Sequence, residues 1–121
     1  MHKSLAALAL LCLLAACGGE PSEGQIMQMA RRFHTTAGSA TRVQTIELTV
    51  PDGFVIASTD GATVTDTKGG SHQPQECQLS TADGAQKLSV RVELPAGAET
   101  QTIQVDKYVI DVKEGVIRRA K

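Results

Sequence analysis

The stretch KLSVRVEL occupies residues 87–94 and alternates strictly between apolar and polar side chains. Its even-numbered residues are all Leu or Val, whereas its odd-numbered residues are Lys, Ser, Arg and Glu. A period of two is typical of a β-strand that buries one face and exposes the other to water. We therefore expect Val90 and Val92 to point into a core and Arg91 to point into solvent.

Segments of similar character lie on both sides of this strand. The stretch VQTIELTV at 43–50 alternates in the same way, and Pro51-Asp52-Gly53 follows it as a turn signal. Asp60-Gly61 is a favoured type I′ turn, which predicts a β-hairpin around it. The further strand candidates are residues 54–59, 62–67, 77–80, 101–112 and 116–119.

The segment 101–112 contains a change in the apolar period. Its apolar residues are odd-numbered before Asp106–Lys107 and even-numbered after it, which predicts a β-bulge or bend there. Several short strands separated by turns favour an antiparallel fold. The sequence therefore predicts an all-β domain over residues 43–121, a small antiparallel sandwich or barrel of about seven strands.

A different pattern precedes this domain. In residues 25–36, Ile26, Met29, Ala30 and Phe33 stand at i, i+3, i+4 and i+7, the spacing of one helix face. We therefore expect a short helix and linker over residues 25–42. Residues 17–24 read CGGEPSEG, a composition typical of a flexible tether.

The N-terminal segment has the features of a targeting signal. Lys3 precedes an unbroken apolar run over residues 5–16. Twelve residues of helix span roughly 18 Å, which is short of the hydrocarbon core of about 30 Å. Residues 1–16 are therefore predicted to be a cleaved signal peptide, with a buried core helix as the alternative.

The run ends Leu14-Ala15-Ala16-Cys17, which resembles the lipobox of bacterial lipoproteins. The resemblance implies that Cys17 carries a diacylglyceryl group on its sulfur and that cleavage occurs just before it. The alternative is an ordinary A-x-A signal with an incidental cysteine. Gly18 follows the cysteine, and in this class the absence of Asp there favours the outer membrane over the inner one. More than one acyl chain would give a stable anchor.

Composition narrows the possible functions. The formal net charge is −1, which argues against a generally basic nucleic-acid binder. One Tyr, two Phe and no Trp make a stacking platform for bases or sugars improbable. Charge is nonetheless uneven, because residues 25–42 carry three Arg and no acid. This asymmetry is explained either by ordinary surface solubility or by a basic end that faces phosphate-bearing membrane or cell wall.

Cysteine and histidine provide few candidates for chemistry. Cys12 would leave with the signal peptide and Cys17 would carry lipid, so Cys77 remains as a buried thiol, a free reactive thiol or half of an intermolecular disulfide. His72, Glu76 and Cys77 offer N, O and S ligands, but their spacing matches no established zinc pattern. We therefore assign no catalytic, cofactor or metal residue.

These observations predict a non-enzymatic lipoprotein of the bacterial envelope that faces the periplasm. Its expected partners are membrane lipid, reached through acylated Cys17, and another envelope protein that it binds or helps to assemble. No nucleic-acid partner is expected. The alternative function is a small-ligand or metal carrier that uses the loop 68–77.

Overall fold

The computed structural model describes residues 21–35, 38 and 40–120. Within these residues the chain forms ten β-strands and no helix, and every strand pair is antiparallel. The strands are β1 (Glu23–Gln25), β2 (Met27–Thr35), β3 (Thr41–Thr49), β4 (Thr63–Asp66), β5 (Ser71–His72), β6 (Glu76–Ala82), β7 (Ala85–Pro95), β8 (Thr100–Val105), β9 (Tyr108–Asp111) and β10 (Val116–Arg119).

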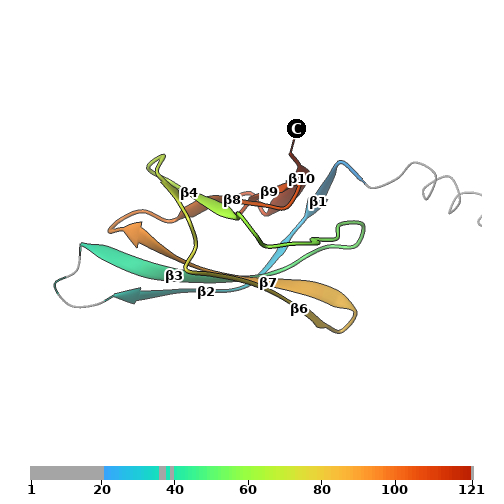
Figure 1. Cartoon of the computed structure of the whole chain (residues 1–121), viewed down its shortest axis with the longest axis horizontal. Helices are drawn as coiled ribbons and strands as arrows, with labels where there is room; N and C mark the ends of the chain where they lie inside the picture. Colours follow the sequence, from blue (N-terminus) through green and yellow to red (C-terminus); the bar gives the residue numbers. More distant parts are fainter. Residues whose placement is uncertain (1–20, 36–37, 39, 121) are drawn as a thin grey trace, which may run out of the picture.

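The strands belong to two sheets. One has six strands in the order β1-β10-β9-β8-β4-β5, and the other has four in the order β2-β3-β7-β6. Figure 1 shows the two sheets as facing layers, the arrangement of a β-sandwich. The prediction of an all-β antiparallel fold is therefore confirmed.

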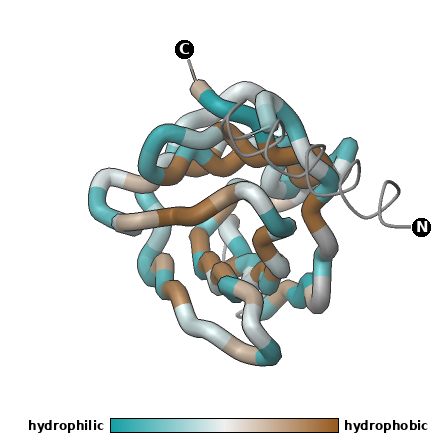
Figure 2. The backbone as a smooth tube through the Cα atoms, turned by 90° about the vertical axis from the view of Figure 1, so that its right-hand side faces the viewer, coloured by the Kyte–Doolittle hydropathy of each residue, from teal (hydrophilic) through white to brown (hydrophobic). Residues whose placement is uncertain are grey.

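The core lies between the layers and follows the predicted alternation. In β7, Val90 and Val92 have no exposed surface, whereas Arg91 between them is exposed. Ile46 and Leu48 of the neighbouring β3 are fully buried as well. Figure 2 shows hydrophobic backbone segments within both layers and hydrophilic turns around them. Burial of these apolar side chains is the main stabilising contribution to the fold.

The helix predicted over residues 25–36 is wrong, because this segment forms the end of β1 and all of β2. The helical spacing on which that prediction depended involves only four apolar residues. Ile26 is a core residue, at 8% exposure, and its N–H donates to the Gly115 carbonyl, whereas Ala30 and Phe33 are only partly buried. The strand forms because β3, the next strand along the chain, supplies a nine-residue hydrogen-bonding partner, and this pairing outweighs the helical spacing of the apolar residues. Of the expected tether, residues 17–20 lie outside the described residues, and Glu23 and Gly24 belong to β1.

The segment 54–59 is also not a strand, although Phe54 and Ile56 are buried in the core. Side chains replace a strand partner here. The Gln86 amide accepts from the Ile56 N–H at 2.8 Å and donates to the Ile56 carbonyl at 2.9 Å. Asp106 accepts from the Ala57 N–H at 2.7 Å. Asp60-Gly61 is a turn that leads into β4. The hairpin predicted around this turn does not form, because residues 54–59 are not a strand.

Two-residue turns connect β8 to β9 and β6 to β7, and the first of them explains the change of apolar period in residues 101–112. Val105 pairs with Tyr108 across Asp106–Lys107, so the parity change there comes from a two-residue hairpin turn between β8 and β9. Asp106 has a positive φ of 56°, which short polar side chains tolerate. At the β6–β7 turn, Asp83 and Gly84 have φ of 54° and 78°, as a type I′ turn requires.

The chain passes from one sheet to the other four times, between β1 and β2, β3 and β4, β5 and β6, and β7 and β8. Between β1 and β2 only Ile26 separates the two sheets, and between β5 and β6 residues 73–75 make the crossing. In the four-stranded sheet, β2 and β6 are the two outer strands.

Candidate functional site

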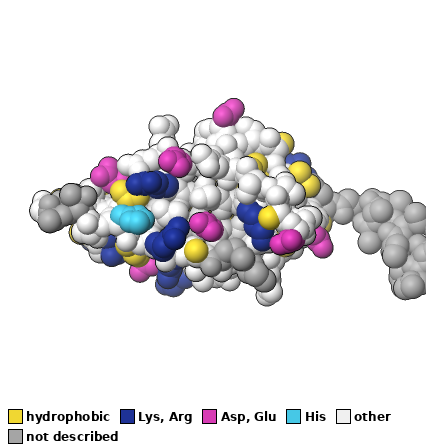
Figure 3. Space-filling view, turned by 90° about the horizontal axis from the view of Figure 1, so that it is seen from below, with side chains coloured by type: hydrophobic (Ala, Val, Ile, Leu, Met, Phe, Trp, Pro, Cys, Tyr) yellow, Lys and Arg dark blue, Asp and Glu magenta, His cyan; other side chains and the backbone are white. Residues whose placement is uncertain are grey.

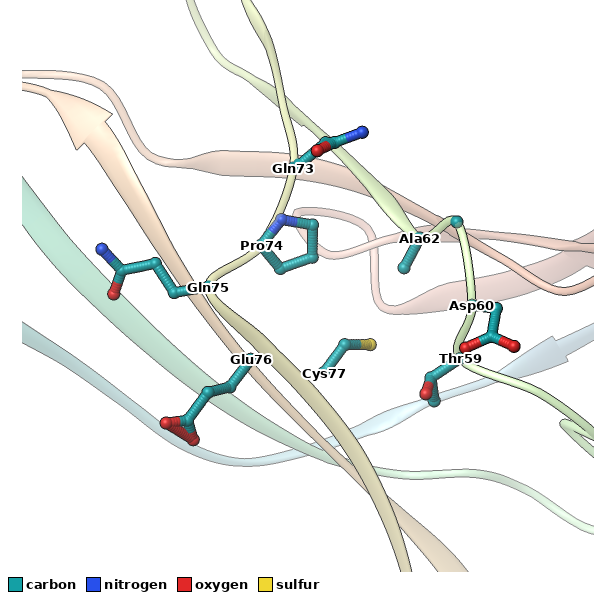
Figure 4. Close-up of a pocket in the computed structure, with 9 residues that line it drawn as sticks. Thr59, Asp60, Ala62, Gln73, Pro74, Gln75, Glu76 and Cys77 are labelled. Carbon is teal, nitrogen blue, oxygen red and sulfur yellow. The ribbon is translucent and has the colours of Figure 1, made fainter.

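His72, Glu76 and Cys77, the possible metal ligands in the sequence, are not brought together. Figure 4 shows the Cys77 sulfur pointing toward Thr59 and Asp60, whereas the Glu76 side chain points away from it. Successive residues of a strand face opposite sides, so this divergence follows from their place in β6. Among the residues that the structure describes, no group of three His, Cys, Asp or Glu side chains could hold a metal ion.

His72 bonds Asp66 instead. Its Nε2 lies 2.5 Å from Asp66 Oδ2, and Asp66 Oδ1 accepts from the N–H groups of Lys68 at 2.7 Å and Gly70 at 3.0 Å. The Asp66 side chain is only 1% exposed. The His72 hydrogen bond is the main reason that the pKa of Asp66 is lowered, with smaller contributions from both backbone bonds, while burial opposes them. The carboxylate therefore fixes the turn between β4 and β5.

Cys77 is half-buried and packs against the core. Burial raises the pKa of its thiol, which keeps the sulfur protonated and weakly nucleophilic at neutral pH. Beside it is a polar hollow of about 330 Å³, lined by residues 59–62 and 73–77. Figure 4 shows this hollow between the loop before β4 and the start of β6.

The outer face of the four-stranded sheet is polar. Figure 3 looks onto this layer from below and shows Lys and Arg side chains interspersed with Asp and Glu. Arg32 pairs with Glu47 at 3.5 Å across β2 and β3. This face has the composition of a solvated surface, so it gives little indication of a ligand.

The free edge of β2 is a stronger candidate. β2 is nine residues long and terminal in its sheet, and its only strand partner among the described residues is β3. It contains no Pro and no acidic residue, but it carries Arg31 and Arg32. A long outer strand with unpaired backbone groups is a template for the addition of another strand.

The register identifies which backbone groups are free. The Val50 N–H donates to the Gln86 carbonyl at 2.8 Å, in direct continuation of the β3–β7 register. Since hydrogen-bonded pairs alternate along an antiparallel ladder, the even-numbered residues of β3 bond β7 and its odd-numbered residues bond β2.

Thr45 of β3 therefore exchanges hydrogen bonds with Arg32, the residue opposite it in β2. The neighbours of Arg32 must turn their backbone groups the other way. The N–H and C=O groups of Arg31, Phe33 and Thr35 accordingly point away from β3, along the open edge. A register shift between Gln28 and Ala30 limits the regular part of this edge to residues 30–35.

An ion pair and a cation–π contact hold side chains beside this edge. Arg31 Nη1 lies 3.2 Å from Glu99 Oε1, and the Arg42 guanidinium lies 3.6 Å above the centre of the Phe33 ring. Next to Arg31 is a hollow of about 260 Å³. Its lining residues are Arg31, Thr67, Glu99, Thr100 and Lys113.

Sequence reasoning missed this edge because it assigned residues 25–36 to a helix. One signal could have revealed it: the small and polar composition of the run TTAGSA at 35–40 is typical of a turn or loop. Gly38 within it has a φ of 79°.

The predicted lipidation residue Cys17 and the predicted signal peptide 1–16 lie outside the described residues. No membrane-spanning helix occurs in the part of the chain that the structure describes. Comparison with known protein families, curated proteins and solved structures finds no match to this chain.

Proposed function

We propose that this chain is a bacterial lipoprotein, anchored in the envelope membrane through Cys17, whose β domain binds another envelope protein. The role is non-enzymatic, and the protein faces the periplasm, in the outer membrane rather than the inner one. The lipobox residues Leu14 to Cys17 support the anchor. The open edge of β2 is the observation that supports protein binding.

Position-specific photo-crosslinking in living cells tests the binding role. A photoreactive residue is placed at His34, which is exposed on β2, and as a matched control at Gln78, which is exposed on β6 at the opposite edge of the same sheet. We expect a discrete protein adduct from position 34 that is absent from position 78. Equal adduct patterns from both positions, or no adduct from either, would contradict the proposed role.

The polar hollow beside Cys77 supports a second candidate function, a small-ligand or metal carrier that uses the loop 68–77. For metal, titration calorimetry with Zn²⁺ on the full-length protein is the test. We expect no stoichiometric binding, because His72 is bonded to Asp66 and Glu76 points away from the sulfur. Binding that disappears in Cys77→Ser would instead establish the carrier function.

A further inference from the structure

We propose that the partner of β2 is an extended acidic segment, which adds to the sheet as a fifth strand and places a carboxylate beside Arg31. This inference rests on the proposed protein-binding function and specifies the chemistry of the partner. Main-chain hydrogen bonds would provide affinity, and alternate side chains would provide selectivity.

The backbone of the edge supplies the first part of the argument. Arg31, Phe33 and Thr35 direct their N–H and C=O groups outward, two residues apart, which is the repeat that an incoming strand requires. Within residues 21–35, 38 and 40–120, no other backbone group bonds these three residues on the open side. As far as the described residues extend, these outward groups are therefore available to an incoming strand.

Charge supplies the second part. β2 and the first residues of β3 carry Arg31, Arg32 and Arg42 and no acid. An opposite charge on a cross-strand neighbour is favourable, whereas a like charge is unfavourable. The edge therefore favours Glu or Asp on the incoming strand and disfavours Lys or Arg.

The same charges argue against a second copy of this chain as the occupant. Arg31 is the central residue of β2, which spans Met27–Thr35. A symmetric antiparallel pairing of two β2 strands would bring Arg31 and Arg32 of both copies into one short ladder that contains no acidic residue, and a pairing centred on Arg31 would place the two Arg31 side chains directly opposite each other. This repulsion makes a partner of different composition the better fit.

The hollow beside the edge supplies the third part. A residue of the incoming strand opposite Arg31 projects on the same face as the Arg31 side chain, toward the hollow of about 260 Å³. Arg31 and Lys113 line this hollow with Glu99, whose carboxylate is 3.2 Å from Arg31. An incoming carboxylate would form ion pairs with Arg31 and Lys113 and would compete with Glu99 for them.

Synthetic peptides test the inference directly. Three capped peptides of about nine residues, the length of β2, alternate Val or Thr with Glu, Gln or Lys. Binding to the full-length lipidated protein in detergent micelles is measured by fluorescence anisotropy. We expect the Glu peptide to bind about tenfold more tightly than the Lys peptide, with the Gln peptide between them, and the difference to shrink in high salt. Equal affinity for the three peptides would overturn the acidic preference.

A proline variant isolates the edge N–H group. Arg31→Pro removes both the outward N–H and the charge, whereas the control Arg31→Ala removes only the charge. We expect Arg31→Ala to weaken Glu-peptide binding about threefold and Arg31→Pro about tenfold or more. Thr35→Pro removes a second outward N–H and gives an independent measurement should Arg31→Pro fail to fold. Thr81→Pro on β6 is the matched control and should leave binding unchanged.

Loss of the competing carboxylate provides a gain-of-binding test. Glu99→Gln frees Arg31 from its ion pair, so we expect the affinity for the Glu peptide to rise about threefold. A decrease would contradict the placement of the incoming carboxylate. Concentration-dependent dimerisation that Arg31→Pro abolishes would identify a second copy as the occupant and overturn the inference. Failure of the peptides while the position 34 adduct persists in cells would reject only the acidic-strand inference, whereas loss of both would reject protein binding as well.

Discussion

Asp66 is the most deeply buried carboxylate of the described residues, and it organises the turn between β4 and β5 through bonds to Lys68, Gly70 and His72. An Asn side chain carries no charge, and its amide nitrogen could not accept the hydrogen bonds that one of the two Asp66 oxygens accepts. The Asp66 interactions are therefore expected to contribute to stability in a way that depends on pH.

The sign of this dependence follows from the lowered pKa of Asp66. A carboxyl group whose pKa falls on folding stabilises the protein above its unfolded value of about 3.9, and this contribution disappears as the pH drops through the folded value. We expect Asp66→Asn to lower the melting temperature at pH 6 and its difference from wild type to narrow below about pH 3.9. Exposed Asp52→Asn is the control and should show little difference at pH 6. A deficit in Asp66→Asn that does not narrow in acid would contradict this role.

Val90 and Arg91 are adjacent in β7 but face opposite environments, with Val90 fully buried and Arg91 exposed. Val90→Asp would bury a charge without a partner, and we expect it to prevent folding or to cost several kcal/mol. Arg91→Asp should change the free energy of unfolding by about 0.5 kcal/mol or less. Thermal melting of the two variants measures these changes in stability, and equal losses of stability would be inconsistent with a half-buried β7.

At the scale of elements, the irregular segment 54–59 depends on one side chain of β7. The Gln86 amide satisfies both the N–H and the C=O of Ile56. We expect Gln86→Ala to lower stability by about 1–3 kcal/mol, because it leaves partly buried backbone groups without partners. Urea denaturation measures this loss, and hydrogen exchange should show faster exchange at the Ile56 amide. Exposed Gln78→Ala on β6 is the control, and an equal effect there would contradict the role of Gln86.

The elements that sequence predicted correctly share one property, which is that local alternation and burial agree. This holds for residues 87–94, and in residues 43–50 for Ile46, Leu48 and Val50, which are all buried in the core. It fails for β2, because a largely exposed outer strand buries no complete row of side chains and so carries little period-two signal. It also fails for residues 54–59, whose alternation is real but whose partners are the side chains of Gln86 and Asp106, distant in sequence.

The candidate site was less predictable than the fold. The absence of known metal and catalytic motifs was readable from sequence, but an open edge is defined by which strand lacks a neighbour. Strand order depends on non-local pairing, such as β3 with both β2 and β7. The Arg31–Glu99 ion pair joins residues that no sequence pattern relates.

At the scale of the whole molecule, the lipobox predicts how the protein is held. Cys17→Ser removes the thiol that would accept the diacylglyceryl group. We expect this variant to lose labelling with radioactive palmitate and to accumulate as uncleaved precursor. Cys77→Ser is the control and should label normally. Undiminished labelling of Cys17→Ser would reject the lipoprotein assignment.

The pairing of β1 with β10 joins the two ends of the described chain, with Glu23 opposite Arg118 across 95 positions. Such a contact raises the contact order and delays folding, since the entropy of a long loop must be lost before the strands can meet. β1 can join the six-stranded sheet only when β10 is available, so completion of that sheet requires both ends of the described chain, whereas β2 can pair early with the neighbouring β3.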